Sequence, residues 1–141
     1  RVYILSVALM GWAPLWATEE EVPTPLSEPD VTTVSAEQLV TLIRSQQSFV
    51  LIDARIASGR KKGYIENSFH LADIDTTCAT LKEFIPTLSQ PAAFYCSSSK
   101  CGRSLNAVRV AKACGFSNIY WFRGGFEEWK EKGLPYSIEK S

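Results

Sequence analysis

The stretch that decides the fold of this chain is AAFYCSSSKCGRS, at residues 92–104. Its first four residues form a short continuous apolar run, which is typical of a strand buried on both faces of a sheet. Small and polar residues follow, and residues 105–114 then show helical spacing that ends at Gly115. The stretch is therefore interpreted as a strand, a loop and the start of a helix.

Similar strand patterns recur along the chain. Residues 49–52 and 119–122 are continuous apolar runs, and residues 69–71 form a weaker one. Helical patterns lie between or beside them, at residues 36–45, 80–85, 105–114 and 126–132. Strands that alternate with helices predict an α/β fold of three layers, with a mostly parallel central sheet flanked by helices.

The N-terminal segment differs from the rest in composition. Residues 2–17 are almost wholly apolar, with Arg1 before them and three consecutive glutamates soon after. This pattern predicts a signal peptide at residues 1–17, and hence a periplasmic or otherwise exported protein. A membrane anchor through residues 2–17 is the alternative, although a helix of that length spans only ~24 Å of a ~30 Å hydrocarbon core. A third reading is a buried N-terminal helix of the domain.

Two further segments follow from composition. Residues 18–32 contain several prolines and acidic side chains, and are expected to form an extended, mobile linker. Residues 33–139 are expected to form a single domain. Because the chain has 15 basic and 15 acidic residues, no nucleic acid is expected as a partner, and a membrane only if the N-terminal segment is retained.

The loop at residues 96–104 carries the candidate chemistry. Cys96 lies where the strand ends, and the expected N-terminus of a helix follows a few residues later. Small residues allow backbone N–H groups to converge on one centre, and the helix dipole adds positive potential there. A thiol in that position is expected to ionise below its free pKa of ~8.5 and to act as a nucleophile. The expected anion-binding groups are the backbone or side chains of Ser97, Ser98, Ser99, Lys100, Gly102 and Arg103. Ser104 is expected to cap the following helix.

Four sequence blocks then resemble those of the rhodanese-like domain family, over about residues 34–138. They are LIDAR at 51–55, GYIENSFHL at 63–71, the loop at 96–104, and GGFEEW at 124–129 with GLP at 133–135. The resemblance implies sulfurtransferase chemistry. Cys96 would take a sulfane sulfur from a small anionic donor such as thiosulfate, hold it as a persulfide, and pass it to a thiol, to cyanide or to a protein acceptor.

The loop differs from the common family pattern in its length. Six residues separate Cys96 from Arg103, whereas the common rhodanese loop has four and the related phosphatases have five. The additional residues include Cys101, and in this feature the chain resembles exported single-domain rhodaneses with two cysteines in the loop. Cys101 could attack the Cys96 persulfide, form a reversible disulfide with Cys96, carry the sulfur itself, or be passive.

Other notable residues are expected to support the fold. Asp53, Arg55 and His70 are interpreted as structural, and the basic run at residues 60–62 as solvated surface or a docking patch. Cys78 and Cys114 are interpreted as packing residues, since four cysteines are too few for a disulfide scaffold. With one histidine and no second pair of ligands, the sequence predicts no metal site and no cofactor.

Two other functions fit the same residues. Cys96 and Cys101 could form a thiol-disulfide redox element without carrying sulfur, and that function would require both thiols. Alternatively, the domain could be a non-catalytic interaction module, which would retain its partner after loss of both cysteines. A phosphatase is a weaker fourth possibility, which release of phosphate from an aryl phosphate would test.

Overall fold

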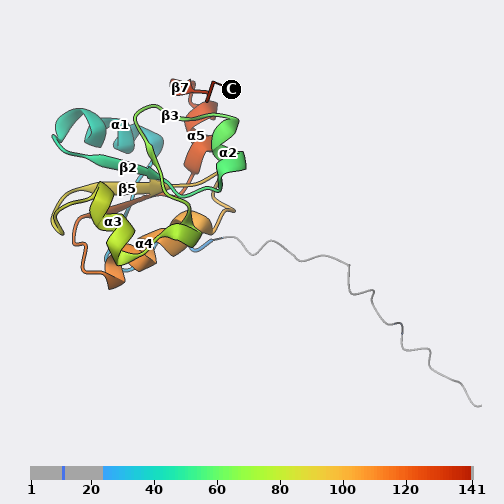
Figure 1. Ribbon diagram of the computed structural model, residues 1–141. Coiled ribbons are helices and arrows are strands. Elements are labelled where there is room, and N and C mark those ends of the chain that lie inside the picture. Colours follow the sequence, from blue (N-terminus) through green and yellow to red (C-terminus); the bar gives the residue numbers. More distant parts are fainter. Residues whose placement is uncertain (1–10, 12–23, 141) are drawn as a thin grey trace, which may run out of the picture.

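The computed structural model describes residue 11 and residues 24–140 (Figure 1). The expected signal peptide, except for its residue 11, and residues 18–23 of the expected linker lie outside the described residues. In the part of the chain that the structure describes, no helix is long and apolar enough to cross a membrane.

The three apolar runs form the centre of a parallel sheet. They are β2 (Val50–Asp53), β5 (Ala92–Tyr95) and β6 (Ile119–Phe122), and the strand order is β1-β6-β5-β2-β4. The edge strands are β1 (Thr32–Thr33) and β4 (Phe69–His70), and every pairing in this sheet is parallel. A separate antiparallel pair joins β3 (Tyr64–Ile65) to β7 (Tyr136–Ser137).

The register of the central strands brings their carboxyl ends to one edge. Asp53 of β2 is paired with Tyr95 of β5, which in turn is paired with Phe122 of β6. The segments that follow these three residues therefore begin side by side. In open α/β sheets this is the edge where ligands bind.

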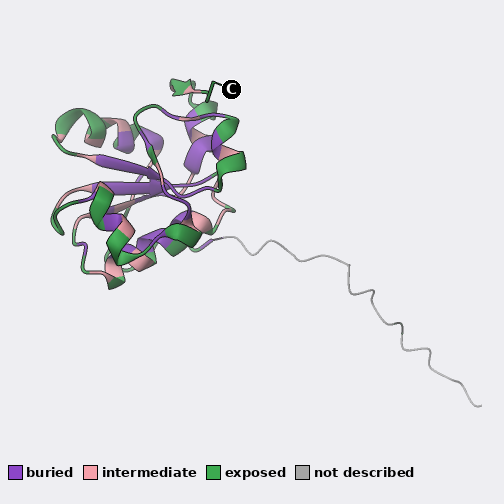
Figure 2. Ribbon diagram, in the orientation of Figure 1, coloured by how far each residue is buried: buried purple, intermediate pink, exposed green. Residues whose placement is uncertain are grey.

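Helices cover both faces of the sheet, as the strand–helix alternation predicts (Figures 1 and 2). α1 (Ala36–Ser45) and α5 (Gly125–Glu131) pack on one face, and α3 (Cys78–Phe84) and α4 (Arg103–Ala113) on the other. A short α2 (Ala57–Lys61) and a 3-10 turn, η1 (Asp73–Asp75), follow β2 and β4. The three-layer α/β fold expected from the sequence is confirmed.

Local sequence signals explain where two of the helices begin. The Ser35 side chain and Gln38 form a capping box at the start of α1, as their spacing predicts. Thr77 and Thr80 form a second one, so that α3 begins at Cys78 rather than at residue 80. α4 begins at Arg103 with Gly102 at the N-cap, so the expectation that Ser104 caps this helix was wrong.

Residues 24–30 lie against the domain. Arg123 donates hydrogen bonds to the carbonyl oxygens of Thr24 and Pro25, at 2.9 and 2.8 Å. Arg109 of α4 pairs with Glu28 at 3.1 Å. This part of the expected linker is therefore held against Arg123, which follows β6, and against α4, instead of extending freely.

Two structural expectations about side chains were wrong. Arg60 is buried, with 9% exposure, and its guanidinium lies 3.2 Å from Asp53 Oδ2, although Lys61 and Lys62 beside it are exposed as expected. Cys78 and Cys114 form a disulfide that joins α3 to the end of α4, with the two Cα atoms 5.4 Å apart. No local signal marks this pair because 36 positions separate the two cysteines in the sequence.

Candidate active site

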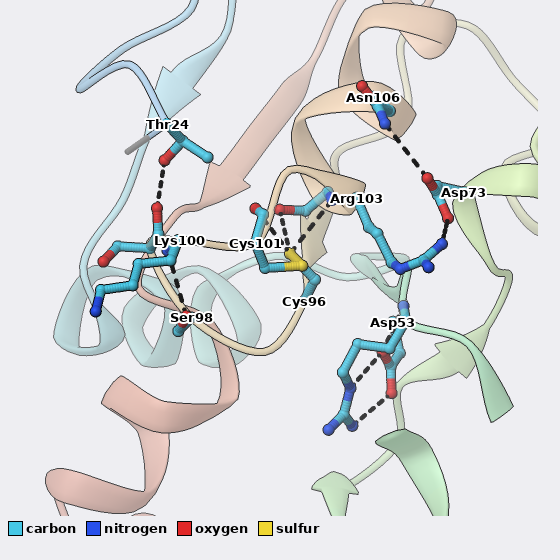
Figure 3. The surroundings of a disulfide bond; sticks show 12 residues. Thr24, Asp53, Asp73, Cys96, Ser98, Lys100, Cys101, Arg103 and Asn106 are labelled. Carbon is cyan, nitrogen blue, oxygen red and sulfur yellow. Dashed lines mark hydrogen bonds and ion pairs between the residues drawn. A yellow bond between two sulfur atoms is a disulfide. The ribbon is translucent and has the colours of Figure 1, made fainter. Parts of the chain in front are cut away.

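The loop between β5 and α4 places the two cysteines together at the carboxyl edge of the sheet (Figure 3). Cys96 is buried, with 1% exposure, and Cys101 is partly exposed. The two residues form a disulfide with a Cα–Cα distance of 6.3 Å. The loop therefore brings Cys101 within bonding distance of the candidate nucleophile.

The sulfur of Cys96 is also held by Ser104, in the first turn of α4. The Ser104 N–H donates to Cys96 Sγ at 3.4 Å, and the Ser104 hydroxyl lies 3.1 Å from the same sulfur. The Trp121 indole N–H donates to the Ser104 hydroxyl at 2.9 Å. Because an indole can only donate, the hydroxyl proton of Ser104 is directed away from Trp121 and is available to Cys96.

These contacts bear on the ionisation of Cys96 once the disulfide is reduced. Two donors from Ser104, at the positive end of the α4 dipole, favour the thiolate. The carbonyl oxygen of Cys101, 3.2 Å from Cys96 Sγ, can accept a hydrogen bond from the thiol and so favours the protonated form. The helix N-terminus thus acts on the sulfur through one backbone and one side-chain donor.

The backbone of the loop is fixed by α5. The N–H groups of Phe126 and Glu127 donate to the carbonyl oxygens of Cys96 and Ser97, each at 2.9 Å. In a trans peptide the N–H points opposite to the carbonyl. The N–H groups of Ser97 and Ser98 therefore point away from α5, and this fixes two of the donors expected to bind an anion.

Gly125 permits this close approach of α5 to the loop. It has a positive φ of 63°, and a side chain there would overlap the carbonyl group of Cys96. In the sequence, Gly125 stands out only as part of the GGFEEW block. Its function follows from a contact between the start of α5 and the loop, which local sequence does not reveal.

The side chain of Arg103 is bound to Asp73, and the side chain of Lys100 is exposed. The Arg103 guanidinium donates to Asp73 Oδ1 at 2.7 Å, and Asn106 donates to the other carboxylate oxygen of Asp73 at 3.3 Å (Figure 3). The Arg103 side chain is 39% exposed and Lys100 is exposed. Asp73 was not identified from the sequence, and a direct contact of Arg103 with a substrate stays a prediction.

A buried ionic network supports the edge of the sheet beneath the loop. Asp53 accepts hydrogen bonds from Arg55 at 2.9 and 2.8 Å and from Arg60 at 3.2 Å. Arg55 also donates to the carbonyl oxygen of Gly63 at 2.7 Å, and His70 Nε2 lies 2.6 Å from the carbonyl oxygen of Arg55. These contacts fit the structural function expected for Asp53, Arg55 and His70.

Tyr95, immediately before Cys96, belongs to the same buried layer. Its hydroxyl accepts a hydrogen bond from the N–H of Ile65 at 3.1 Å and lies 2.9 Å from the Ser68 hydroxyl. Burial, together with the nearby negative charge of Asp53, raises the pKa of Tyr95 to about 12. The phenol is therefore a neutral support for the strand that presents Cys96.

Two cavities of opposite character adjoin the loop. One of about 280 Å³ reaches the loop at Ser97. Its other lining residues include three cationic side chains and one acidic side chain, Arg55, Lys62, Lys130 and Glu127. The second, of about 400 Å³, reaches the loop at Ser99 and is lined by one cationic and three acidic side chains, Arg123, Glu127, Glu128 and Glu131. A small anion is therefore favoured on the Ser97 side of the loop.

Comparison with known families agrees with this geometry. The model of the rhodanese-like domain matches residues 35–132, which is most of the chain and includes both sheet faces and the loop. The chain belongs to the rhodanese-like domain family. The resemblance inferred from four sequence blocks is thus confirmed at the level of the family.

Rhodanese-like proteins of several organisms are similar to this chain. Rhodanese-like domain-containing protein 17 of Arabidopsis thaliana is 29% identical over 126 residues, covering 82% of this chain and 79% of the relative. The thiosulfate sulfurtransferase GlpE of Actinobacillus succinogenes is 29% identical over 106 residues, covering 74% and 88%. Both similarities extend across the loop that holds the cysteines.

Solved structures show the same fold. The BH2092 protein of Bacillus halodurans superposes with a TM-score of 0.68 at 18% identity, covering 76% of this chain and 77% of its own. A polysulfide-sulfur transferase homodimer of Wolinella succinogenes gives 0.63 at 22% identity, covering 79% and 81%. These similarities support the rhodanese fold.

Proposed function

We propose that this protein is a sulfurtransferase that carries a sulfane sulfur as a persulfide on Cys96. The observation that carries the proposal is the position of Cys96, which directly follows a central strand and whose Sγ accepts from the Ser104 N–H at the N-terminus of α4. A persulfide anion formed there would receive the same positive potential as the thiolate. Similarity to a thiosulfate sulfurtransferase supports this reaction class.

The reaction begins when the Cys96 thiolate attacks the outer sulfur of the donor. With thiosulfate as the donor, the bond between the two thiosulfate sulfurs breaks, sulfite leaves, and Cys96 holds one additional sulfur. A thiol or cyanide then removes that sulfur and restores the thiolate. No metal or organic cofactor takes part in this scheme.

The loop and its basic cavity favour an anionic donor. Lys62 and Lys130 line the cavity beside Ser97, and the N–H groups of Ser97 and Ser98 supply a second set of donors on the side of the loop that faces away from α5. Backbone N–H groups and lysine charges are suited to sulfite or sulfonate oxygens. Ser99, Lys100, Gly102 and Arg103 complete the substrate-binding group that we propose.

A test follows from the requirement for a free Cys96. After reduction, the protein should convert thiosulfate and cyanide to sulfite and thiocyanate, whereas the Cys96→Ser variant should not. Protein that has not been reduced should be inactive, because Cys96 is then in a disulfide. Equal activity of Cys96→Ser and the reduced wild type would contradict the proposal.

A second candidate function is a thiol-disulfide redox element. The Cys96–Cys101 disulfide is the observation that favours it. Such an element would exchange electrons with dithiols without taking up sulfur from thiosulfate. It would lose all function in either Cys96→Ser or Cys101→Ser.

We further propose that the protein is exported, through an N-terminal signal at residues 1–17. The Cys78–Cys114 disulfide supports this proposal, because structural disulfides persist in oxidising compartments. Fractionation of cells that produce the full chain tests it. The protein should leave the cytoplasm with its N-terminal segment removed, and recovery with the cytoplasmic fraction would contradict the proposal.

A further inference from the structure

We propose that Cys101 resolves the Cys96 persulfide and releases hydrogen sulfide, so that the protein reduces thiosulfate at the expense of a dithiol. This inference rests on the proposed persulfide on Cys96. It adds to that function a second product, a required second cysteine and a class of reductant. The observations that carry it are the Cys96–Cys101 bond and the unequal surroundings of its two sulfurs.

The loop is built to hold Cys101 close to Cys96. The Cys101 N–H donates to the carbonyl oxygen of Ser98 at 3.0 Å, which closes a turn within the loop. At the other side of that turn, α5 fixes the carbonyl groups of Cys96 and Ser97. The Cα–Cα distance of 6.3 Å between the two cysteines is within the range that a disulfide spans. Attack of one sulfur on the other therefore requires no opening of the loop.

The resolving step balances in atoms and electrons. Cys101 attacks Cys96 Sγ, the inner sulfur of the persulfide. A bond forms between Cys101 Sγ and Cys96 Sγ while the bond from Cys96 Sγ to the outer sulfur breaks. The outer sulfur leaves as hydrosulfide with the proton of the Cys101 thiol. The two cysteines are oxidised by two electrons and the sulfane sulfur is reduced by two.

The disulfide in the structure is the product of this step, and an external dithiol must reduce it. Cys101 is partly exposed, whereas Cys96 is buried. The dithiol therefore attacks Cys101 Sγ and expels Cys96 as a thiolate. The Ser104 N–H and hydroxyl receive that thiolate, and a stabilised thiolate is the better leaving group. The net reaction converts thiosulfate and a dithiol to sulfite, hydrosulfide, a proton and a disulfide.

Cys78 and Cys114 take no part in this cycle. Their disulfide joins α3 to the far end of α4, eleven residues from the end that meets Cys96. They form a separate pair that can be followed in the same experiment. Trypsin cleaves after Lys62, Lys82, Lys100 and Lys112, so each of the four cysteines lies on a different tryptic peptide. Every possible pairing then has its own peptide mass.

The test is a single turnover without external thiol. Full-length protein is reduced with a dithiol, freed of it under anaerobic conditions, and mixed with thiosulfate. Sulfite and sulfide are measured, and the cysteine peptides are mapped by mass. The wild type should release one sulfide for each sulfite and link the Cys96 peptide to the Cys101 peptide. The Cys101→Ser variant should release sulfite, retain one additional sulfur on Cys96, and lose the release of sulfide.

The outcomes separate this inference from the function on which it rests. If the wild type accumulates the Cys96 persulfide and releases no more sulfide than Cys101→Ser, the resolving step is wrong and the sulfurtransferase proposal stands. If neither protein releases sulfite nor takes up sulfur on Cys96, the sulfurtransferase proposal itself fails, and the resolving step fails with it. Thiocyanate formation by Cys101→Ser with cyanide shows that this variant is folded, and Cys101→Ala repeats the comparison without a hydroxyl.

Discussion

Ser104 illustrates how much of the site depends on a single side chain. It is fully buried, accepts a hydrogen bond from Trp121, and presents its N–H and hydroxyl to Cys96 Sγ. From the sequence alone a helix cap is expected at this residue, because serine is common in that position. The sulfur contact depends on the return of the chain from β5 to α4, which local propensity does not describe.

We expect Ser104→Ala to reduce the reactivity of Cys96. A hydrogen bond to a charged group contributes about 1.5 to 3 kcal/mol, so alkylation of the thiolate at neutral pH should slow about tenfold or more. The measurement is the rate of iodoacetamide addition to Cys96 in the Cys101→Ser background after reduction. Ser98→Ala is the matched control. It also removes a loop hydroxyl, but the Ser98 hydroxyl accepts from the Lys100 N–H and the hydroxyl at Cys96 Sγ is that of Ser104. Equal rates in the two variants would show that Ser104 does not stabilise the thiolate.

Tyr95 should make stability sensitive to alkaline pH. The pKa of its phenol is raised from 10.0 to about 12 in the folded protein, chiefly by burial. Between those two values the unfolded chain loses a proton that the folded protein retains. Stability from this group is therefore complete below about pH 10 and decreases as the pH rises to about 12, by about 2 to 3 kcal/mol.

Urea denaturation at a series of pH values measures this decrease. Tyr95→Phe should be less stable than the wild type at neutral pH, because the buried Ile65 N–H loses its acceptor. The same variant should have a smaller loss of stability between pH 10 and 12. Parallel curves for the two proteins over that interval would exclude Tyr95 as the titrating group.

At the scale of elements, the contact between α5 and the loop is the feature that unites the site. Phe126 and Glu127 donate to the loop carbonyls, and Gly125 supplies the space and the left-handed backbone that bring them there. The helix itself was predicted to within one residue, at 126–132 against Gly125–Glu131. Its contact with the loop was not predicted, because strand and helix patterns do not report which loops touch.

Substitutions at two glycines separate the effect of this contact on stability from the effect of the left-handed backbone. Gly125 and Gly133 have positive φ values of 63° and 68°, but a side chain would meet the loop only at Gly125. Gly133→Ala should lower the free energy of unfolding by about 1 kcal/mol, the cost of the left-handed backbone alone. Gly125→Ala should lower it by at least about 2 kcal/mol more and should also impair sulfur uptake. Stability is measured by urea midpoints and sulfur uptake by sulfite release. Equal effects of Gly125→Ala and Gly133→Ala would show that the loop moves aside for the added side chain at no cost.

Elements with strong local signals were predicted well. The apolar runs at 92–95 and 119–122 match β5 and β6, and the capping box at Ser35 and Gln38 fixes the start of α1. Arg60 shows the limit of such reasoning. Its lysine neighbours suggest a solvated surface, whereas its guanidinium forms a buried ion pair with the carboxylate of Asp53, seven positions earlier.

At the scale of the whole molecule, the Cys78–Cys114 disulfide links two helices on one face of the sheet. Closure of a loop of this length should contribute about 3 to 4 kcal/mol by limiting the unfolded chain. The double variant Cys78→Ala, Cys114→Ala should therefore unfold at lower urea concentration than the oxidised wild type. The urea midpoint of the fully reduced wild type should lie close to that of the double variant. The folded double variant should still take up sulfur on Cys96. Unchanged midpoints would show that the bond contributes nothing to stability.

The arrangement around Trp121 has a practical consequence. Its indole donates to Ser104, and Ser104 contacts the sulfur that is expected to pass through disulfide, thiolate and persulfide states. The tryptophan is fully buried, so solvent does not dominate its surroundings. We expect its intrinsic fluorescence to change when the loop sulfur changes its chemical state. The protein thus contains its own optical reporter, and each step of the cycle can be timed in a stopped-flow instrument without a label.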